Sequence, residues 1–231
     1  MKSPIILALD TKSIEEADSW ISATKNSVGI YKIGLELFLR IGISGTENLI
    51  NKHEVELFLD LKLHDIPNTV GQAVSSVAGL NPKFLTVHAS GGSEMVKAAV
   101  LAAGKTSITA VTILTSLNDE DLSRIGYRDG SLTSAVNLAA LATSAGATSI
   151  VCSPFEVSAI RRRVGSDVVL ITPGVRPADS EVGDQKRSTT PAEAIANGAD
   201  YVVIGRPITS YAKESLEAMT RRASEISSSL L

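Results

Sequence analysis

Short apolar runs alternate with longer amphipathic segments along the whole chain, and this alternation repeats about eight times. A short apolar run bounded by turn residues is typical of a buried strand, and the amphipathic segments have the pattern of helices. The strands are predicted at residues 5–9, 28–33, 55–61, 84–88, 107–113, 149–152, 168–172 and 201–204. Capping residues are expected to open several of the helices: Ser13 with Glu16 three positions on, Ser153-Pro154, and Thr190-Pro191.

Eight such units in 231 residues predict an α/β fold, a closed (β/α)8 TIM barrel made by a single domain over residues 1–231. An open doubly wound sheet would carry a glycine-rich fingerprint after its first strand. Asp10-Thr11-Lys12 stands there instead, so no dinucleotide cofactor is expected. Residues 116–134 and 174–189 have no regular pattern. Both segments follow predicted strands, which places them on the carboxyl-terminal face, where barrel enzymes carry their active-site loops.

Charged residues interrupt the third predicted strand at its carboxyl end. In an extended chain residues two apart share a face, so Asp60 and Lys62 should point the same way. Pro67 suits the first turn of a helix, and Asp65 therefore falls in the preceding loop. Two carboxylates are thus expected to flank one ammonium. A structural ion pair is the simpler interpretation, but charges at the inward end of a buried strand are costly, which favours a functional site.

The other predicted strands also end in polar or ionisable residues. In chain order these are Asp10, Lys32, His88, Thr115, the loop containing Arg176, and Gly205-Arg206. So many ionisable groups at one mouth of a barrel favour chemistry over simple packing. Strand order alone predicts an alternating array in which Lys32 lies between Asp10 and Asp60. The turn after the eighth strand is where barrels often bind phosphate, although Arg206 could instead be a surface residue at a helix start.

Composition narrows the range of partners. A formal net charge of −3 and an isoelectric point near 5.7 leave no basic excess for a nucleic acid, so none is expected to bind. A lone Cys152 excludes an intrachain disulfide, and neither it nor the three histidines have metal-ligand spacing, so no metal site is expected. The chain has no signal-peptide pattern and no apolar stretch of spanning length, which predicts no membrane partner and a cytoplasmic location.

Motifs at these strand ends can be compared with known families as a set. They are Leu9-Asp10, Tyr31-Lys32-Ile33-Gly34, Asp60-Leu61-Lys62-Leu63-His64-Asp65-Ile66-Pro67-Asn68-Thr69, Val87-His88-Ala89, Leu114-Thr115-Ser116, Pro173-Gly174-Val175-Arg176-Pro177, Gly183-Asp184-Gln185 and Ile204-Gly205-Arg206. Together they resemble the orotidine 5'-monophosphate decarboxylase family over nearly the whole chain. The Asp-x-Lys-x-x-Asp part alone is less specific, because sugar-phosphate decarboxylases and aldol-type synthases of the same barrel superfamily share it.

The resemblance implies decarboxylation of orotidine 5'-monophosphate to uridine 5'-monophosphate and carbon dioxide, the last step of pyrimidine nucleotide synthesis. It implies a homodimer with active sites at the subunit interface, and neither a cofactor nor a metal. Lys62 would protonate C6 of the pyrimidine as the carboxylate leaves, with Asp60 against that carboxylate. Lys32 matches the second lysine of the family's charge array, and Asp10 matches the residue that holds the ribose and Lys32.

The same resemblance assigns the remaining contacts to the nucleotide. Three residues would reach into the site of the partner subunit: Asp65, Ile66 and Thr69. Either Thr115 or Ser116 would bond to the edge of the pyrimidine. Four residues would hold the phosphate, the second of them on a closing loop: Arg176, Gln185, Gly205 and Arg206.

Two other functions fit part of the pattern. A magnesium-dependent sugar-phosphate decarboxylase or aldol-type synthase would be expected to offer the metal a carboxylate from the second strand, where this chain has Lys32. A barrel that binds nucleotide phosphates without catalysis would not need a cluster as costly as Asp60, Lys62 and Asp65.

Overall fold

The computed structural model describes residues 3–177 and 189–230. Eight parallel strands form a closed barrel in chain order, each paired with its sequence neighbours and the last with the first. The strands are β1 (Ile5–Ala8), β2 (Ile30–Gly34), β3 (Glu56–Leu63), β4 (Phe84–His88), β5 (Ser107–Val111), β6 (Ser149–Val151), β7 (Val169–Thr172) and β8 (Tyr201–Ile204). The predicted (β/α)8 barrel is therefore confirmed, and each predicted strand lies within two residues of an observed one.

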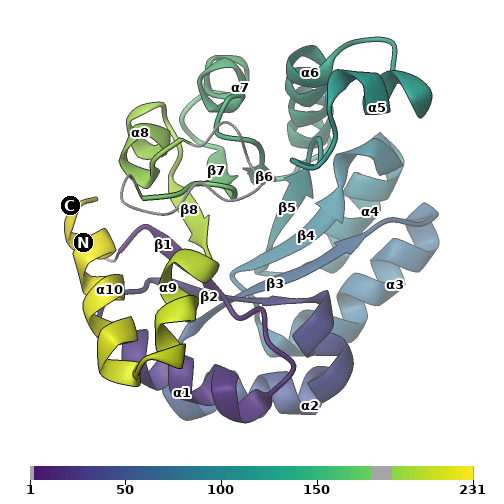
Figure 1. The fold of residues 1–231 in the computed structure, drawn as a ribbon. Coiled ribbons are helices and arrows are strands. Elements are labelled where there is room, and N and C mark those ends of the chain that lie inside the picture. Colours follow the sequence, from purple (N-terminus) through teal and green to yellow (C-terminus); the bar gives the residue numbers. More distant parts are fainter. Residues whose placement is uncertain (1–2, 178–188, 231) are drawn as a thin grey trace.

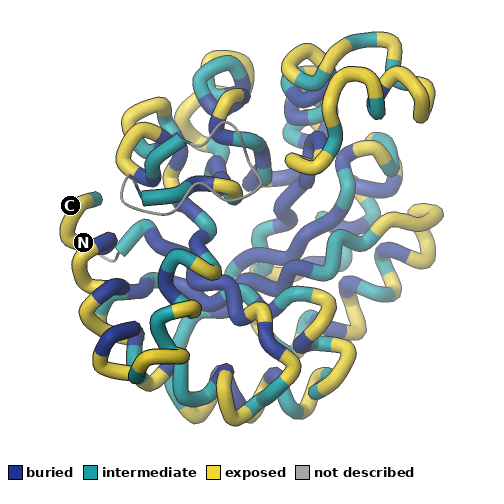
Figure 2. Tube along the Cα trace, in the orientation of Figure 1, coloured by how far each residue is buried: buried dark blue, intermediate teal, exposed yellow. Residues whose placement is uncertain are grey.

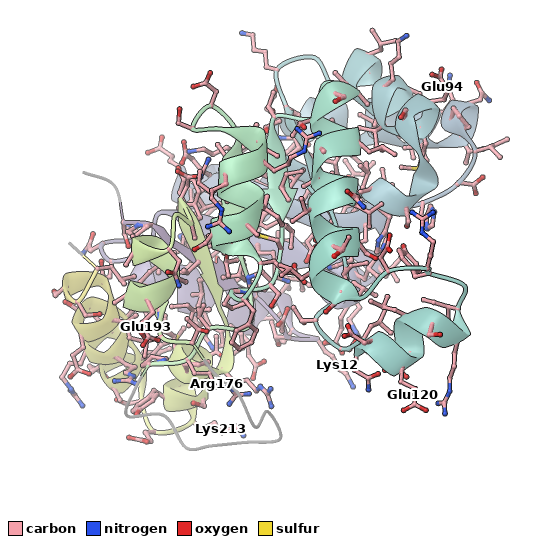
Figure 3. The ribbon with its side chains drawn as sticks, turned by 90° about the horizontal axis from the view of Figure 1, so that it is seen from above. Lys12, Glu94, Glu120, Arg176, Glu193 and Lys213 are labelled. Atoms are coloured by element: carbon pink, nitrogen blue, oxygen red, sulfur yellow. The ribbon has the colours of Figure 1, made fainter. Side chains whose placement is uncertain are left out.

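Helices surround the barrel (Figure 1). The α-helices are α1 (Ile14–Thr24), α2 (Leu35–His53), α3 (Pro67–Val77), α4 (Ser93–Ala102), α5 (Asp119–Arg124), α6 (Ser131–Ser144), α7 (Val157–Val164), α8 (Pro191–Ala196), α9 (Arg206–Thr209) and α10 (Leu216–Ser228). Short 3-10 turns occur at η1 (Ala78–Leu80), η2 (Ala89–Gly91) and η3 (Ser210–Lys213). Charged side chains of the outer helices, such as Glu94 and Glu120, lie at the periphery (Figure 3).

Most of the predicted helix starts agree with the structure. The Ser13 hydroxyl accepts the N–H of Glu16, and Thr190 forms a reciprocal capping box with Glu193. The expectation at Ser153-Pro154 was wrong, because α7 begins only at Val157.

The prediction of an irregular segment over residues 116–134 was also wrong. This segment contains α5 and the start of α6. Asn118 and Asp121 form a capping box at the amino end of α5, which compensates for the short length of that helix. Six residues are too few to give a recognisable apolar period, and this is why the pattern missed the helix.

Apolar packing fills the barrel toward the amino ends of its strands. Inside the barrel, one cluster consists of Ile6, Ile30, Phe58, Phe84 and Ile171. The rings of Phe58 and Phe84 meet edge to face with centroids 5.8 Å apart. A larger cluster lies between strands and helices, so the strands are buried almost throughout (Figure 2). The interior is therefore closed near the amino ends, and polar residues are left at the carboxyl ends.

The segment that leads into β1 lies beside the end of α10, and the hydroxyls of Ser3 and Ser227 are 3.1 Å apart (Figure 1). Within residues 3–177 and 189–230, none of the helices combines the length and the hydropathy that crossing a membrane requires.

Candidate active site

A cavity of about 340 Å³ opens at the carboxyl ends of the strands. Its lining includes most of the residues predicted from the strand ends, namely Asp10, Lys32, Asp60, Lys62, Thr115, Arg176, Gly205 and Arg206. Apolar residues such as Val111 and Val203 line the rest of the wall. A largely apolar cleft with a few convergent charges is the usual form of a small-molecule site.

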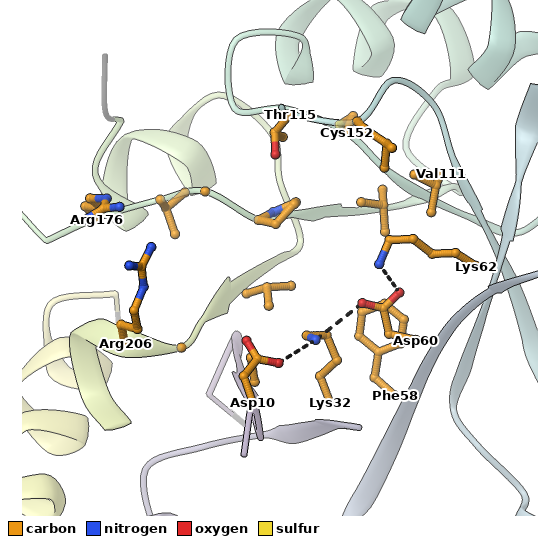
Figure 4. Close-up of a pocket in the computed structure, with 18 of the residues that line it drawn as sticks. Asp10, Lys32, Phe58, Asp60, Lys62, Val111, Thr115, Cys152, Arg176 and Arg206 are labelled. Atoms are coloured by element: carbon orange, nitrogen blue, oxygen red, sulfur yellow. Dashed lines mark hydrogen bonds and ion pairs between the residues drawn. The ribbon is translucent and has the colours of Figure 1, made fainter. Parts of the chain in front are cut away.

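Four charged side chains form a continuous chain along one wall of the cavity (Figure 4). Lys32 Nζ lies 3.3 Å from Asp10 Oδ1 and 3.4 Å from Asp60 Oδ2. Lys62 Nζ lies 2.7 Å from the other oxygen of Asp60. The alternating Asp, Lys, Asp, Lys array expected from strand order is therefore present. Lys32 lies on β2, Asp60 and Lys62 lie on β3, and Asp10 follows the end of β1.

Asp60 is the central and most buried acid of this array, with 10% of its side chain exposed. Burial by itself raises the pKa of the Asp60 carboxyl, but the positive charges of Lys32 and Lys62 and hydrogen bonds from Lys62 and Thr86 outweigh that effect. The net result is a pKa below its ordinary value, so the carboxylate is charged at neutral pH. The ammonium groups of Lys32 and Lys62 thus both form ion pairs with one buried carboxylate, that of Asp60.

Lys62 occupies an unusual backbone conformation. Its φ angle is 49°, in the left-handed region that residues other than glycine rarely adopt. The pairing of β3 with β4 shifts between Leu59 and Leu63, which marks a bulge at this point. Bulges and strained residues cluster at functional sites, where they aim a side chain. Asp60 and Lys62 do face the same space, as predicted, but through a bulge and not through a regular strand.

The opposite side of the cavity carries two guanidinium groups. Arg176, after β7, and Arg206, after β8, both line the cavity and lie away from Lys62 in Figure 4. Gly205 lines the cavity beside Arg206. Two cations within one cavity can bind a multiply charged oxyanion such as a phosphate. Gln185, the remaining residue expected here, lies outside the described residues.

The pyrimidine-binding alternatives differ in position. Both residues are exposed, but Thr115 lines the cavity and Ser116 does not. The structure of a single chain therefore brings Thr115, and not Ser116, to the site.

The expectation that Asp65 flanks Lys62 was wrong for a single chain. Asp65 is exposed, and one of its carboxylate oxygens accepts the N–H of Ile66 at 2.6 Å. Within the described part of the chain, Lys62 forms its ion pair with Asp60. Ile66 and Thr69 are also exposed, outside the cavity lining. The loop after β3 is short, because Pro67 already begins α3.

Sequence reasoning missed one residue of the array. Thr86 on β4 is completely buried, and its hydroxyl donates to Asp60 Oδ1 at 3.0 Å. The sequence did carry a signal for Thr86, because it is a hydroxyl residue two positions before His88 in an otherwise apolar strand. The histidines themselves do not form a metal centre: in the described part of the chain, no three His, Cys, Asp or Glu side chains are arranged to hold an ion.

The whole barrel matches one family model. Residues 3–221 match the model described as the orotidine 5'-phosphate decarboxylase / HUMPS family. The chain belongs to this family. The matched range includes all the cavity residues described above.

Curated relatives of this chain carry the name of the same family. The chain is 54% identical over 209 residues to the orotidine 5'-phosphate decarboxylase of Thermobifida fusca, with 90% of each chain covered. It is 45% identical over 235 residues to the enzyme of the same name from Paramagnetospirillum magneticum, covering 98% of this chain and 99% of that one. The crystal structure of orotidine 5'-phosphate decarboxylase from Lactobacillus acidophilus has the same fold, with a TM-score of 0.82 and 34% identity over 97% of this chain and 99% of that chain.

Proposed function

We propose that the chain converts orotidine 5'-monophosphate to uridine 5'-monophosphate and carbon dioxide, with Lys62 as the proton donor. The observation that carries this proposal is the array of Asp10, Lys32, Asp60 and Lys62 along one wall of the cavity. The bond between C6 and the carboxylate breaks, and its electron pair stays on C6. A proton moves from Lys62 Nζ to C6, and Lys62 takes a new proton from water.

Electrostatics explain why a fixed ammonium suits this reaction. Loss of carbon dioxide from C6 leaves a carbanion whose charge is not delocalised into a neighbouring carbonyl. A cation that is already aimed at C6 stabilises this anion without reorganisation when the charge develops. Asp60 holds the Lys62 ammonium at 2.7 Å, and Lys32 fixes Asp60 from the other side. Asp60 would also repel the substrate carboxylate, and this repulsion ends when carbon dioxide leaves.

Phosphate binding would supply the energy that orders the site. Arg176 and Arg206 lie across the cavity from Lys62, and Gly205 next to Arg206 also lines it, so we propose that these three residues bind the phosphate of the nucleotide. Binding energy from a part of the substrate that does not react can be used to orient the part that does. Gln185 is proposed to join these residues on the basis of the family resemblance, and Thr115 to bond to the pyrimidine.

The enzyme is proposed to act as a homodimer with shared sites. Asp65, Ile66 and Thr69 are exposed and do not line the cavity of their own chain, and 65% of Ile66 is exposed, which suits residues that contact a second copy of the chain. Mixing Lys62→Ala subunits with Asp65→Ala subunits should restore activity, because one site in each mixed dimer would contain both native residues. Absence of any recovery would count against shared sites. A cytoplasmic location stays a prediction.

A magnesium-dependent decarboxylase or synthase acting on a sugar phosphate remains the alternative, since the family description also includes the HUMPS branch. Lys32 argues against it, because an ammonium occupies the place where such an enzyme needs a metal-binding carboxylate. The test is the ultraviolet absorbance of orotidine 5'-monophosphate during incubation with the purified protein in excess EDTA. The absorbance should fall at an undiminished rate; a requirement for added magnesium would reject the mechanism.

A further inference from the structure

The bulge in β3 leaves one residue of β4 opposite three residues of β3. The pairs on either side of the bulge are Leu59 with Leu85 and Leu63 with Val87. Between them β4 has Thr86 alone, whereas β3 has the segment that contains both Asp60 and Lys62. The regular ladder of backbone hydrogen bonds is interrupted here, so the amide groups of the bulge need other partners.

The Thr86 hydroxyl replaces part of the missing ladder. It accepts the backbone N–H of Lys62 at 2.8 Å and donates its own proton to Asp60 Oδ1 at 3.0 Å. A threonine hydroxyl has one proton to donate and lone pairs to accept, so both bonds can form together. The same oxygen of Asp60 receives Lys62 Nζ at 2.7 Å. One hydroxyl therefore connects the backbone of Lys62 to the carboxylate that binds its side chain.

We propose that Thr86 is a positioning residue for the decarboxylation, one that fixes both the backbone and the ammonium of Lys62. It does not line the cavity and is completely buried, so it acts through Lys62 and Asp60 without touching the substrate. The left-handed backbone of Lys62 persists only if its surroundings enforce it. Without the hydroxyl, the Lys62 amide would lose its acceptor, and Asp60 would lose one of the groups that orient it. This inference rests on the proposed role of Lys62.

Three variants separate positioning from general stability. Thr86→Val keeps the size of the side chain and removes both hydrogen bonds, and Thr86→Ser keeps the hydroxyl. Thr109→Val is the matched control, because Thr109 is equally buried and pairs with Thr86 across β4 and β5, but its hydroxyl bonds to Ser149 and not to the charge array. Steady-state kinetics with orotidine 5'-monophosphate, binding of uridine 5'-monophosphate and thermal unfolding should be measured for each.

Thr86→Val should lower kcat by about 10- to 100-fold. This is the range expected when the buried N–H of Lys62 loses its acceptor and the Lys62 ammonium is no longer held in position. KM and product binding should change little, since the phosphate contacts lie elsewhere. Thr86→Ser should restore most of kcat, and Thr109→Val should keep it even if its melting temperature falls as far. If Thr86→Val does not fold, Thr86→Ala carries the same prediction of low kcat with unchanged product binding.

Two results would overturn the inference. One is a kcat for Thr86→Val or Thr86→Ala equal to that of the wild type. The other is a loss of kcat in Thr86→Val that Thr86→Ser does not recover or that Thr109→Val reproduces, since either result would indicate that Thr86 has a structural role. Failure of the proposed function would look different: the wild type would not consume orotidine 5'-monophosphate, or Lys62→Ala would turn it over normally.

Discussion

Replacing Asp60 with asparagine should destabilise the folded protein far more than the same change at Asp10. Both acids contact Lys32, at 3.4 Å and 3.3 Å respectively. Asp60 also binds Lys62 at 2.7 Å, and only 10% of its side chain is exposed, against 66% for Asp10. Asparagine keeps the shape of the side chain and removes the charge, so the two ammonium groups would lose the anion that they share.

The size of the effect follows from these distances. With an effective dielectric constant of about 20, the attraction of Asp60 is about 6 kcal/mol to Lys62 and about 5 kcal/mol to Lys32. Desolvation of the buried carboxylate offsets most of this sum, and removal of one partner from a buried pair usually costs about 3–5 kcal/mol. We therefore expect Asp60→Asn to lower the free energy of unfolding by about 3 kcal/mol at neutral pH. Asp10→Asn should cost about 1 kcal/mol or less, because water screens an exposed pair.

Urea unfolding of the wild type and both variants between neutral pH and about pH 3 measures this difference. The pKa of Asp60 is held below the unfolded value of 3.8 despite its burial. Its stabilisation is therefore complete above that value and is lost as the pH falls through the lower, folded pKa. The gap between wild type and Asp60→Asn should narrow in acid. A gap that does not depend on pH, or equal costs for Asp60→Asn and Asp10→Asn, would refute the reasoning.

Three further predictions concern other groups. Arg206→Ala should weaken binding of uridine 5'-monophosphate by about 10- to 100-fold in calorimetry and leave uridine binding unchanged; equal losses for both would exclude a phosphate contact. Burial raises the pKa of Glu156 from 4.5 to about 7, so the wild type should lose up to about 3 kcal/mol of stability as the pH rises through that range. Glu156→Gln should abolish this dependence of the free energy of unfolding on pH, as measured by urea unfolding at each pH. Arg161 donates hydrogen bonds to three backbone carbonyls and to Asp200, so Arg161→Ala should lower the free energy of unfolding by about 2–4 kcal/mol. Arg162 is exposed, and Arg162→Ala should change the free energy of unfolding by less than about 0.5 kcal/mol. Similar values for the two variants would contradict this prediction.

The fold could be predicted because the hydrophobic pattern locates the strands, and in this parallel barrel the strands pair in the order in which they occur along the chain. Once eight strands are placed in order, their carboxyl ends must meet at one mouth. Asp10, Lys32 and Asp60 therefore had to become neighbours, and the structure places them within ion-pair distance. The capping residues that open α1 and α8, Ser13 and Thr190, could also be predicted, because a cap depends on residues that are close in sequence.

Features that depend on tertiary contacts could not be read in the same way. The predicted alternation along β3 assumes a regular pleat, but Lys62 lies in a bulge whose geometry is determined by β4. Thr86 acquires its role only when these two strands pair. Arg161 is one of three arginines in the last turn of α7, where a solvated position would be expected from sequence, yet it donates to carbonyls before β7 and β8. Asp65 does not line the cavity of its own chain, and its proposed partner belongs to another chain.

Turnover by Lys62→Ala tests the central claim most directly. The variant should be assayed with orotidine 5'-monophosphate in excess EDTA, and its binding of uridine 5'-monophosphate should be measured on the same preparation. The account predicts that turnover is lost while the product still binds, because the arginines across the cavity remain in place. Turnover at the wild-type rate would contradict it, since C6 would then receive its proton from another group.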